Sequence, residues 1–180
     1  MPLVFQYGSN CTAARLNGPT RLNGNAKDLG RAQTIEEYDI AFNVPSQTNG
    51  CAAADLVDAG GSGHGVWGVL YEIPEDIIRG KRDDGQKTLE QIEGPRYEEK
   101  TIRVRNEAGE EVEATTFVVI KNHRDPTLWT SVAYVSFIIY GLRAHGVPEE
   151  YIAHVANTAI RTNEQSVETA SEQTRLIRNL

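Results

Sequence analysis

Cysteine is scarce in this chain, which holds only Cys11 and Cys51 among its 180 residues. Two cysteines cannot build a disulfide framework, and they are too few for a cysteine-ligated zinc site. No apolar run reaches the length of a transmembrane helix, and Met1-Pro2-Leu3 leads straight into strand-forming residues rather than into a signal peptide. These absences predict a reduced, cytoplasmic protein with no membrane partner.

Positive charge is in deficit as well. The 18 Lys and Arg residues are outnumbered by 25 Asp and Glu residues, which gives a formal net charge of −7. Because binding to phosphate backbones requires a basic surface, this balance argues against nucleic acid as a partner. An apolar fraction of 39% in a chain of this length is enough to bury one core, so we expect one globular domain.

Apolar alternation and turn residues divide the chain into short segments. After an opening strand at Val4 and Phe5, the expected strands cover residues 33–42, 51–57, 66–73, 97–105 and 111–120. The expected helices cover residues 12–16, 74–78, 85–93 and 131–146, and another begins at 148. Residues 22–29 are rich in Asn and Gly and are expected to form a loop. We find no repeat and no clear linker, which favours a single α+β domain.

The opening strand ends in a turn with the composition of a ligand-binding loop. Gly8 has no Cβ, so a ligand can approach its backbone, and Ser9 and Asn10 are residues that cap helix N-termini. A strand that runs through glycine into a helix points free N–H groups and the positive end of the helix dipole at one spot. The stretch fits either a plain strand-to-helix turn or a small anion-binding nest.

Glu93 is an acidic residue in an unusual place. Leu89 and Ile92 mark the buried side of the expected helix 85–93, and Glu93, four residues after Leu89, lies on that side. It also occupies the last turn before Gly94, where the negative end of the helix dipole repels a carboxylate. Burial and the dipole both raise the pKa, as a general acid/base requires. The alternative is a solvated acid at a frayed helix end.

Two further features have a structural and a functional interpretation. Cys11 lies beside the glycine turn, but no His or Lys is near it in the sequence, so we expect a buried structural thiol. The glycine-rich residues 59–65 are similar to a phosphate-binding loop in composition only. They lead into the expected strand 66–73 and not into a helix, which argues against a nucleotide site.

Several segments, in the same order, resemble the γ-glutamylcyclotransferase family, including its AIG2-like members. The two most informative are Tyr7-Gly8-Ser9-Asn10 and Leu89-x-x-x-Glu93-Gly94. The others are Gly65-Val66-Trp67-Gly68-Val69-Leu70-Tyr71, Tyr97 after the Glu-Gly pair, Ala133-Tyr134, and residues 141–151. The resemblance implies a cyclotransferase-like domain over residues 3–157. We expect the C-terminal tail, 158–180, to be helical and packed on the same domain.

The resemblance implies a small mixed β-barrel-like sheet flanked by helices, and a reaction without a metal or cofactor. Family members release an amine or amino acid from a small γ-glutamyl substrate by cyclising the glutamyl part to 5-oxoproline. By resemblance Glu93 is the general acid/base, and the substrate-binding residues are Tyr7, Gly8, Ser9, Asn10, Tyr97 and Tyr134. Residues 130–133 lack the prolines that often precede the tyrosine, so the leaving amine stays open. The oligomeric state stays open too, with a homodimer among the options.

Three other functions remain as alternatives. The first is a binding protein for a small metabolite that has this fold but no turnover. The second is a different acyl chemistry, either another γ-glutamyl acyl transfer or a thiol acyltransferase that uses Cys11 as the nucleophile. The third and most distant is a nucleotide-binding protein that uses residues 60–65.

Overall fold

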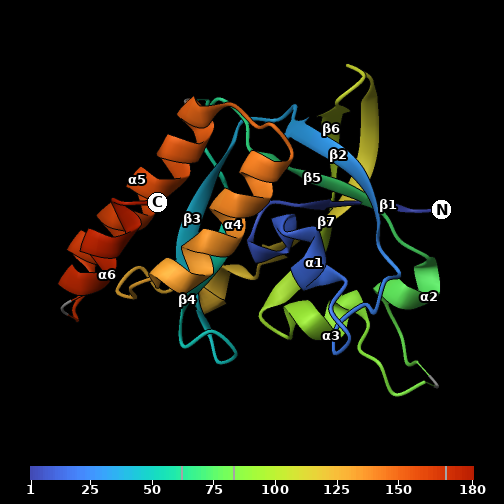
Figure 1. The fold of residues 1–180 in the computed structure, drawn as a ribbon, viewed down its shortest axis with the longest axis horizontal. Coiled ribbons are helices and arrows are strands. Elements are labelled where there is room, and N and C mark those ends of the chain that lie inside the picture. Colours follow the sequence, from blue (N-terminus) through green and yellow to red (C-terminus); the bar gives the residue numbers. More distant parts are fainter. Residues whose placement is uncertain (62, 83, 169) are drawn as a thin grey trace.

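The computed structural model describes residues 1–61, 63–82, 84–168 and 170–180 and shows an α+β fold built on a closed five-stranded barrel (Figure 1). The strands follow the order β1-β5-β2-β6-β7 around the barrel. They are β1 (Leu3–Gln6), β2 (Lys27–Thr34), β5 (Trp67–Glu72), β6 (Tyr97–Asn106) and β7 (Glu111–Val119). Neighbours pair antiparallel except β1 and β7, which close the barrel as a parallel pair. The expected mixed, barrel-like sheet is confirmed.

A second, two-stranded sheet lies beside the barrel. Its strands, β3 (Tyr38–Ser46) and β4 (Cys51–Asp58), pair antiparallel. On β3 the residues Tyr38, Ile40 and Phe42 are buried in alternation, as the sequence pattern predicts. β4 contacts β7, and β3 contacts α5 (Glu149–Gln165), so this sheet connects the barrel to the helical side of the molecule.

Short helical segments follow the strands, and longer helices form the C-terminal third. They are the 3₁₀ turn η1 (Ser9–Cys11), α1 (Ala13–Leu16), α2 (Glu75–Ile78), α3 (Leu89–Glu93), the 3₁₀ turn η2 (Lys121–His123), α4 (Val132–Ala144), α5 and α6 (Ser171–Ile177). In Figure 1, α5 and α6 lie together at the end of the molecule away from the barrel. α4 contacts both of them and also η1, so it connects the C-terminal helices to the turn after β1.

The strand expected at residues 33–42 is wrong, because the chain turns within it. β2 ends at Thr34 and β3 begins at Tyr38. Between them Glu36 points to the surface and forms an ion pair with Arg103 of β6, and its carbonyl accepts a hydrogen bond from Thr34. The loop expected at residues 22–29 is also too long, because β2 starts at Lys27 and pairs there with β5.

The helix expected at residues 85–93 is shorter in the structure. Gly85 has a φ of 73°, a conformation that glycine adopts readily but that ends a helix. α3 starts at Leu89, after Thr88, whose side chain accepts a hydrogen bond from the N–H of Gln91. The Gln91 side chain in turn accepts one from the N–H of Thr88, which completes a capping box. The last turn, which carries Glu93, lies where the sequence places it.

The contact between α4 and η1 fixes the turn that follows β1. A Cβ added to Gly141 would lie 2.4 Å from the carbonyl carbon of Cys11, so the helix and the turn approach this closely only because residue 141 is glycine. The hydroxyl of Thr12 donates a hydrogen bond to the carbonyl of Phe137 on α4 over 2.5 Å. α4 therefore packs against this turn and fixes the position of residues 8–12.

Residues 158–180 form the end of α5 and all of α6. The domain boundary expected at residue 157 falls inside α5, which continues to Gln165. Asn163 of α5 is buried and exchanges two hydrogen bonds with the backbone of Thr130, at 2.7 and 3.0 Å. Ile177 of α6 belongs to the main core. None of the helices in the described ranges is long and apolar enough to cross a membrane.

Candidate active site

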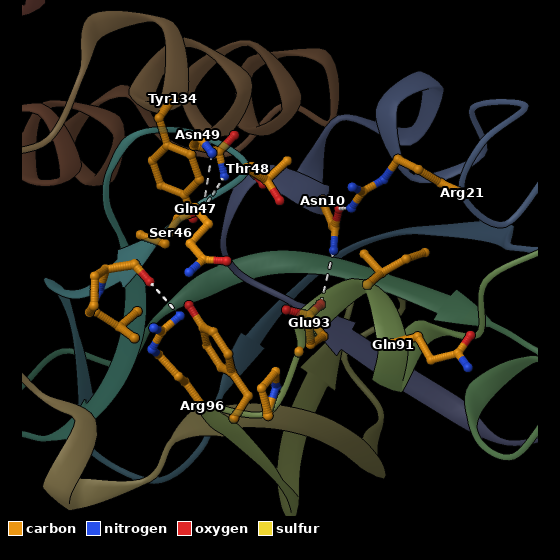
Figure 2. Close-up of a pocket in the computed structure, with 18 of the residues that line it drawn as sticks. Asn10, Arg21, Ser46, Gln47, Thr48, Asn49, Gln91, Glu93, Arg96 and Tyr134 are labelled. Carbon is orange, nitrogen blue, oxygen red and sulfur yellow. Dashed lines mark hydrogen bonds between the residues drawn. The ribbon is translucent and has the colours of Figure 1, made fainter.

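A cavity of about 250 Å³ opens between η1, α3 and the β3–β4 turn (Figure 2). We call it the outer cavity. It shares five lining residues with a much smaller hollow of about 30 Å³, the inner pit. The inner pit is lined by Gln6, Tyr7, Gly8, Ser9, Asn10, Ala54, Glu93, Tyr97, Phe117 and Tyr134. The inner pit has room for a group about the size of a water molecule or a carboxylate. All seven residues proposed from the sequence as site residues line it.

Glu93 lies at the junction of the two spaces and is held there by Asn10. The Nδ2 of Asn10 donates a hydrogen bond to Oε1 of Glu93 over 3.0 Å, and it also lies 3.3 Å from Oε1 of Gln6. The Oδ1 of Asn10 accepts a hydrogen bond from Nη2 of Arg21 over 2.6 Å. Figure 2 shows this chain of contacts from Arg21 through Asn10 to Glu93. The carboxylate is thus fixed in orientation while its residue stays half-buried.

The environment of Glu93 raises the pKa of its carboxyl group above the ordinary value of 4.5. Burial is the main cause, because it removes the charged form from water. The positive charge of Arg21 and the side-chain amides of Gln6 and Asn10 act in the opposite direction without cancelling it. A raised pKa makes this carboxylate a stronger base than an exposed glutamate, as a group that accepts and returns a proton requires.

The turn after β1 leaves main-chain donors free beside the inner pit. The N–H of Cys11 bonds to the carbonyl of Gly8 over 3.0 Å. The N–H groups of Ser9 and Asn10, by contrast, have no hydrogen-bond acceptor within the described residues. Free N–H groups beside a small pit can bind a carboxylate or an oxyanion.

Two of the three predicted tyrosines hold the same residue. The hydroxyl of Tyr97 donates to the carbonyl of Ala54 over 2.8 Å, and the N–H of Ala54 donates to the hydroxyl of Tyr134 over 3.0 Å. Tyr7 differs, because its hydroxyl donates to the carbonyl of Phe117 over 2.6 Å. Burial raises the pKa of Tyr134 to about 12, so this hydroxyl stays neutral and can act only as a hydrogen-bonding group.

Cys11 is a buried thiol, as the sequence predicts. It has no exposed surface, its Sγ lies 3.2 Å from the carbonyl of Gln6, and burial raises its pKa far above the usual range. A reactive thiolate needs the opposite environment, which contradicts the acyl transfer through Cys11. The glycine-rich loop at 59–65, of which Ser62 lies outside the described residues, leads into β5 and not into a helix. No group of His, Cys, Asp or Glu side chains in the described part of the chain is arranged to hold a metal ion.

Sequence reasoning missed three arginines in the outer cavity. Arg15 comes from α1, Arg21 from the loop after it, and Arg96 from the segment between α3 and β6. Figure 2 shows Arg21 and Arg96 on different sides of Glu93. Among the described residues that line the cavity, Glu93 is the only acid, so the lining is positively charged although the whole chain is acidic.

The fold is similar to that of solved cyclotransferase structures. One solved structure, named gamma-glutamyl cyclotransferase, is 20% identical, with a TM-score of 0.71 over 99% of both chains. An uncharacterized protein from Homo sapiens is 21% identical, with a TM-score of 0.71 over 98% of this chain and 97% of the other. A yeast gamma-glutamyl cyclotransferase described as specific to glutathione is 12% identical, with a TM-score of 0.56 over 92% and 97%. At these sequence identities the comparisons show a similar fold and nothing more.

The sequence itself identifies the family. Residues 65–155, which are half of the chain, match the AIG2-like family, and the chain belongs to this family. A search of curated proteins finds no match.

Proposed function

We propose that this chain is a γ-glutamylcyclotransferase-type enzyme, which releases an amine or amino acid from a γ-glutamyl substrate and forms 5-oxoproline. One observation supports the proposal most: a carboxyl group with a raised pKa, Glu93, is held by Asn10 at the junction of a small pit and a larger cavity. The fold shared with a structure named gamma-glutamyl cyclotransferase supports the same reaction class.

The substrate would lie with its glutamyl part toward the inner pit and its leaving group in the outer cavity. The free N–H groups of Ser9 and Asn10 would bind the α-carboxylate or the oxyanion that develops on the γ-carbonyl oxygen. This orientation brings the scissile amide to Glu93, because the inner pit and the outer cavity share that residue.

In the first step Glu93, as carboxylate, takes a proton from the α-ammonium group of the substrate. The freed amine attacks the γ-carbonyl carbon of the same molecule, and a five-membered ring closes. Since the nucleophile and the electrophile belong to one molecule, the protein gains effective molarity by holding the chain curled. The main requirements are therefore orientation and proton transfer.

In the second step the protonated Glu93 gives its proton to the departing nitrogen. The amide C–N bond breaks, and the ring nitrogen, which still carries two hydrogens after the attack, gives up one of them as a proton. The departing amine takes up this proton and leaves as an ammonium ion, and 5-oxoproline remains. One C–N bond forms and one breaks, and no water is consumed. Glu93 returns to the carboxylate form, so the same group acts as base and then as acid.

The experiment measures 5-oxoproline by liquid chromatography after incubation with γ-glutamyl dipeptides, γ-glutamyl-lysine or glutathione. Glu93→Gln should lose about 10²- to 10⁴-fold in kcat and still bind substrate. Glu90→Gln, which changes an exposed neighbour on α3, is the matched control. A Glu93→Gln variant with near wild-type turnover would show the assignment to be wrong. A wild-type chain that binds one of these compounds without forming 5-oxoproline would instead be a binding protein.

A further inference from the structure

The arginines of the outer cavity lack the ion pairs that most arginines of this chain make. Of the 13 arginines in the sequence, all but four form an ion pair with a carboxylate of the described residues. The four exceptions are Arg15, Arg21, Arg96 and Arg161. Three of these four line the outer cavity. Three arginines that form no ion pair within the described residues and line one cavity of an acidic protein favour an anion as the ligand of that cavity.

Side-chain contacts hold Arg15 and Arg21 in place. Nη2 of Arg15 donates to Oδ1 of Asn49 over 3.0 Å, and its guanidinium lies 4.2 Å from the centre of the Phe137 ring. Nη2 of Arg21 donates to Asn10. The Nε atoms of both arginines are buried, and neither has a hydrogen-bond partner within the described residues. These contacts fix both guanidinium groups and leave donors unused.

The charge of Arg15 also acts on the guanidinium group of Arg21. Burial lowers the pKa of Arg21, and the positive charge of Arg15 lowers it further. Two like charges held close together in a half-buried cavity are unfavourable unless an anion joins them. A carboxylate matches the planar donor geometry of guanidinium better than a spherical anion does.

We propose that Arg15 and Arg21 bind the carboxylate of the leaving group, so that the substrates are γ-glutamyl amino acids or peptides and not γ-glutamyl derivatives of uncharged or cationic amines. This inference rests on the proposed function, because it assumes that Glu93 marks the scissile bond. The outer cavity then lies on the leaving-group side, and its arginines meet whatever charge the leaving group carries. A polyamine would bring positive charge into a cavity that already holds three arginines.

The test compares γ-glutamyl-alanine with γ-glutamyl-alaninamide, which differ only in the terminal carboxylate. Calorimetric titration of the Glu93→Gln variant measures binding without turnover. We expect the acid to bind about ten- to hundredfold more tightly than the amide, which is the effect of hydrogen bonds to a charged group. Adding Arg15→Gln or Arg21→Gln should reduce this preference to about threefold or less, and Arg15→Lys should keep an intermediate preference.

The control is Arg161→Gln, which removes the fourth unpaired arginine from an exposed position on α5 and should leave the preference unchanged. Arg15→Gln is the cleaner of the two test variants, because it does not touch Asn10. An equal affinity for acid and amide would overturn the inference. So would variants that weaken both ligands equally, since the arginines would then hold the glutamyl end.

A parallel assay of 5-oxoproline separates this inference from the proposed function. If the wild-type chain converts acid and amide at the same kcat/KM, the function stands and the inference fails. If it binds the acid preferentially through Arg15 and Arg21 but forms no 5-oxoproline from it, the carboxylate site stands and the proposed reaction fails.

Discussion

Asn10 joins Glu93 to Arg21: its Nδ2 donates to the carboxylate over 3.0 Å, and its Oδ1 accepts from the guanidinium over 2.6 Å. The three side chains come from η1, α3 and the loop after α1. The amide lets an acid and a cation influence each other without direct contact. Arg21 therefore keeps its remaining donors for a ligand, and Glu93 keeps a raised pKa that a direct ion pair would lower.

Asn10→Asp tests the effect of this amide on Glu93. The substitution removes the donor and places a second carboxylate beside the first, and both changes disfavour the ionised form of Glu93. The pKa of Glu93 should rise further, so the base form appears only at higher pH. We expect the acid limb of the kcat/KM profile to move to higher pH. Asn157→Asp on the exposed side of α5 is the control, and an acid limb that stays in place would contradict the role of Asn10.

Glu93→Gln should make the folded protein more stable at neutral pH. The folded-state pKa of Glu93 lies above its ordinary value of 4.5, so its contribution to stability is fully present below 4.5 and is lost as pH rises through the raised pKa. Glutamine removes the cost of the buried charge and can still accept the hydrogen bond of Asn10.

Urea unfolding midpoints at pH 7.5 and below pH 4.5 measure this difference. The variant should exceed the wild type at the higher pH, and its advantage should shrink at the lower one. Glu90→Gln is the control. An equal advantage at both values would mean that the charge of Glu93 is not what destabilises the fold.

Tyr134→Phe should destabilise the fold by about 1–3 kcal/mol, because it leaves the N–H of Ala54 without its acceptor in a buried place. Tyr97→Phe removes the donor to the carbonyl of the same residue and should act in the same direction. The measurement is the free energy of unfolding in urea. Tyr140→Phe, on the exposed side of α4, should change it by less than about 0.5 kcal/mol. A Tyr134 variant as stable as the Tyr140 variant would show that the hydroxyl of Tyr134 does not stabilise the fold.

About half of the inner pit could be predicted from two short motifs, because five of its ten lining residues belong to Tyr7-Gly8-Ser9-Asn10 and Glu93-Gly94. Local spacing placed Glu93 on the side of Leu89, and the structure has Leu89 fully buried and Glu93 half-buried. The alternation over residues 38–42 likewise follows from local pattern. The start of α3 was missed, because the capping box of Thr88 and Gln91 begins the helix at Leu89 and not at the expected Gly85.

The arginines of the outer cavity could not be placed from local pattern, since long-range contacts position them. Arg15 reaches Asn49 of the β3–β4 turn and Phe137 of α4, which are far away in the sequence. One weak signal was available. The first 27 residues contain no Asp or Glu, so Arg15 and Arg21 have no acidic neighbour in the sequence although the chain as a whole is acidic.

Gly141→Ala tests whether α4 positions the turn at residues 8–12. In an isolated helix alanine is favoured over glycine by about 1 kcal/mol, so without the contact to η1 the variant would be more stable. In the folded protein the new Cβ would meet the backbone of Cys11 and Thr12 at 2.4 to 2.6 Å. Backbone cannot move away as a flexible side chain can, so we expect a net loss of about 1–3 kcal/mol in the free energy of unfolding.

The substitution should also displace site residues, because Ser9 and Asn10 belong to the turn that the new Cβ would contact. The variant should lose kcat/KM for 5-oxoproline formation at temperatures where it is still folded. Tyr140→Ala, one residue earlier on α4 and exposed, is the control for changes in the helix itself. A Gly141→Ala variant that is more stable than the wild type and equally active would show that η1 does not depend on this helix for its position.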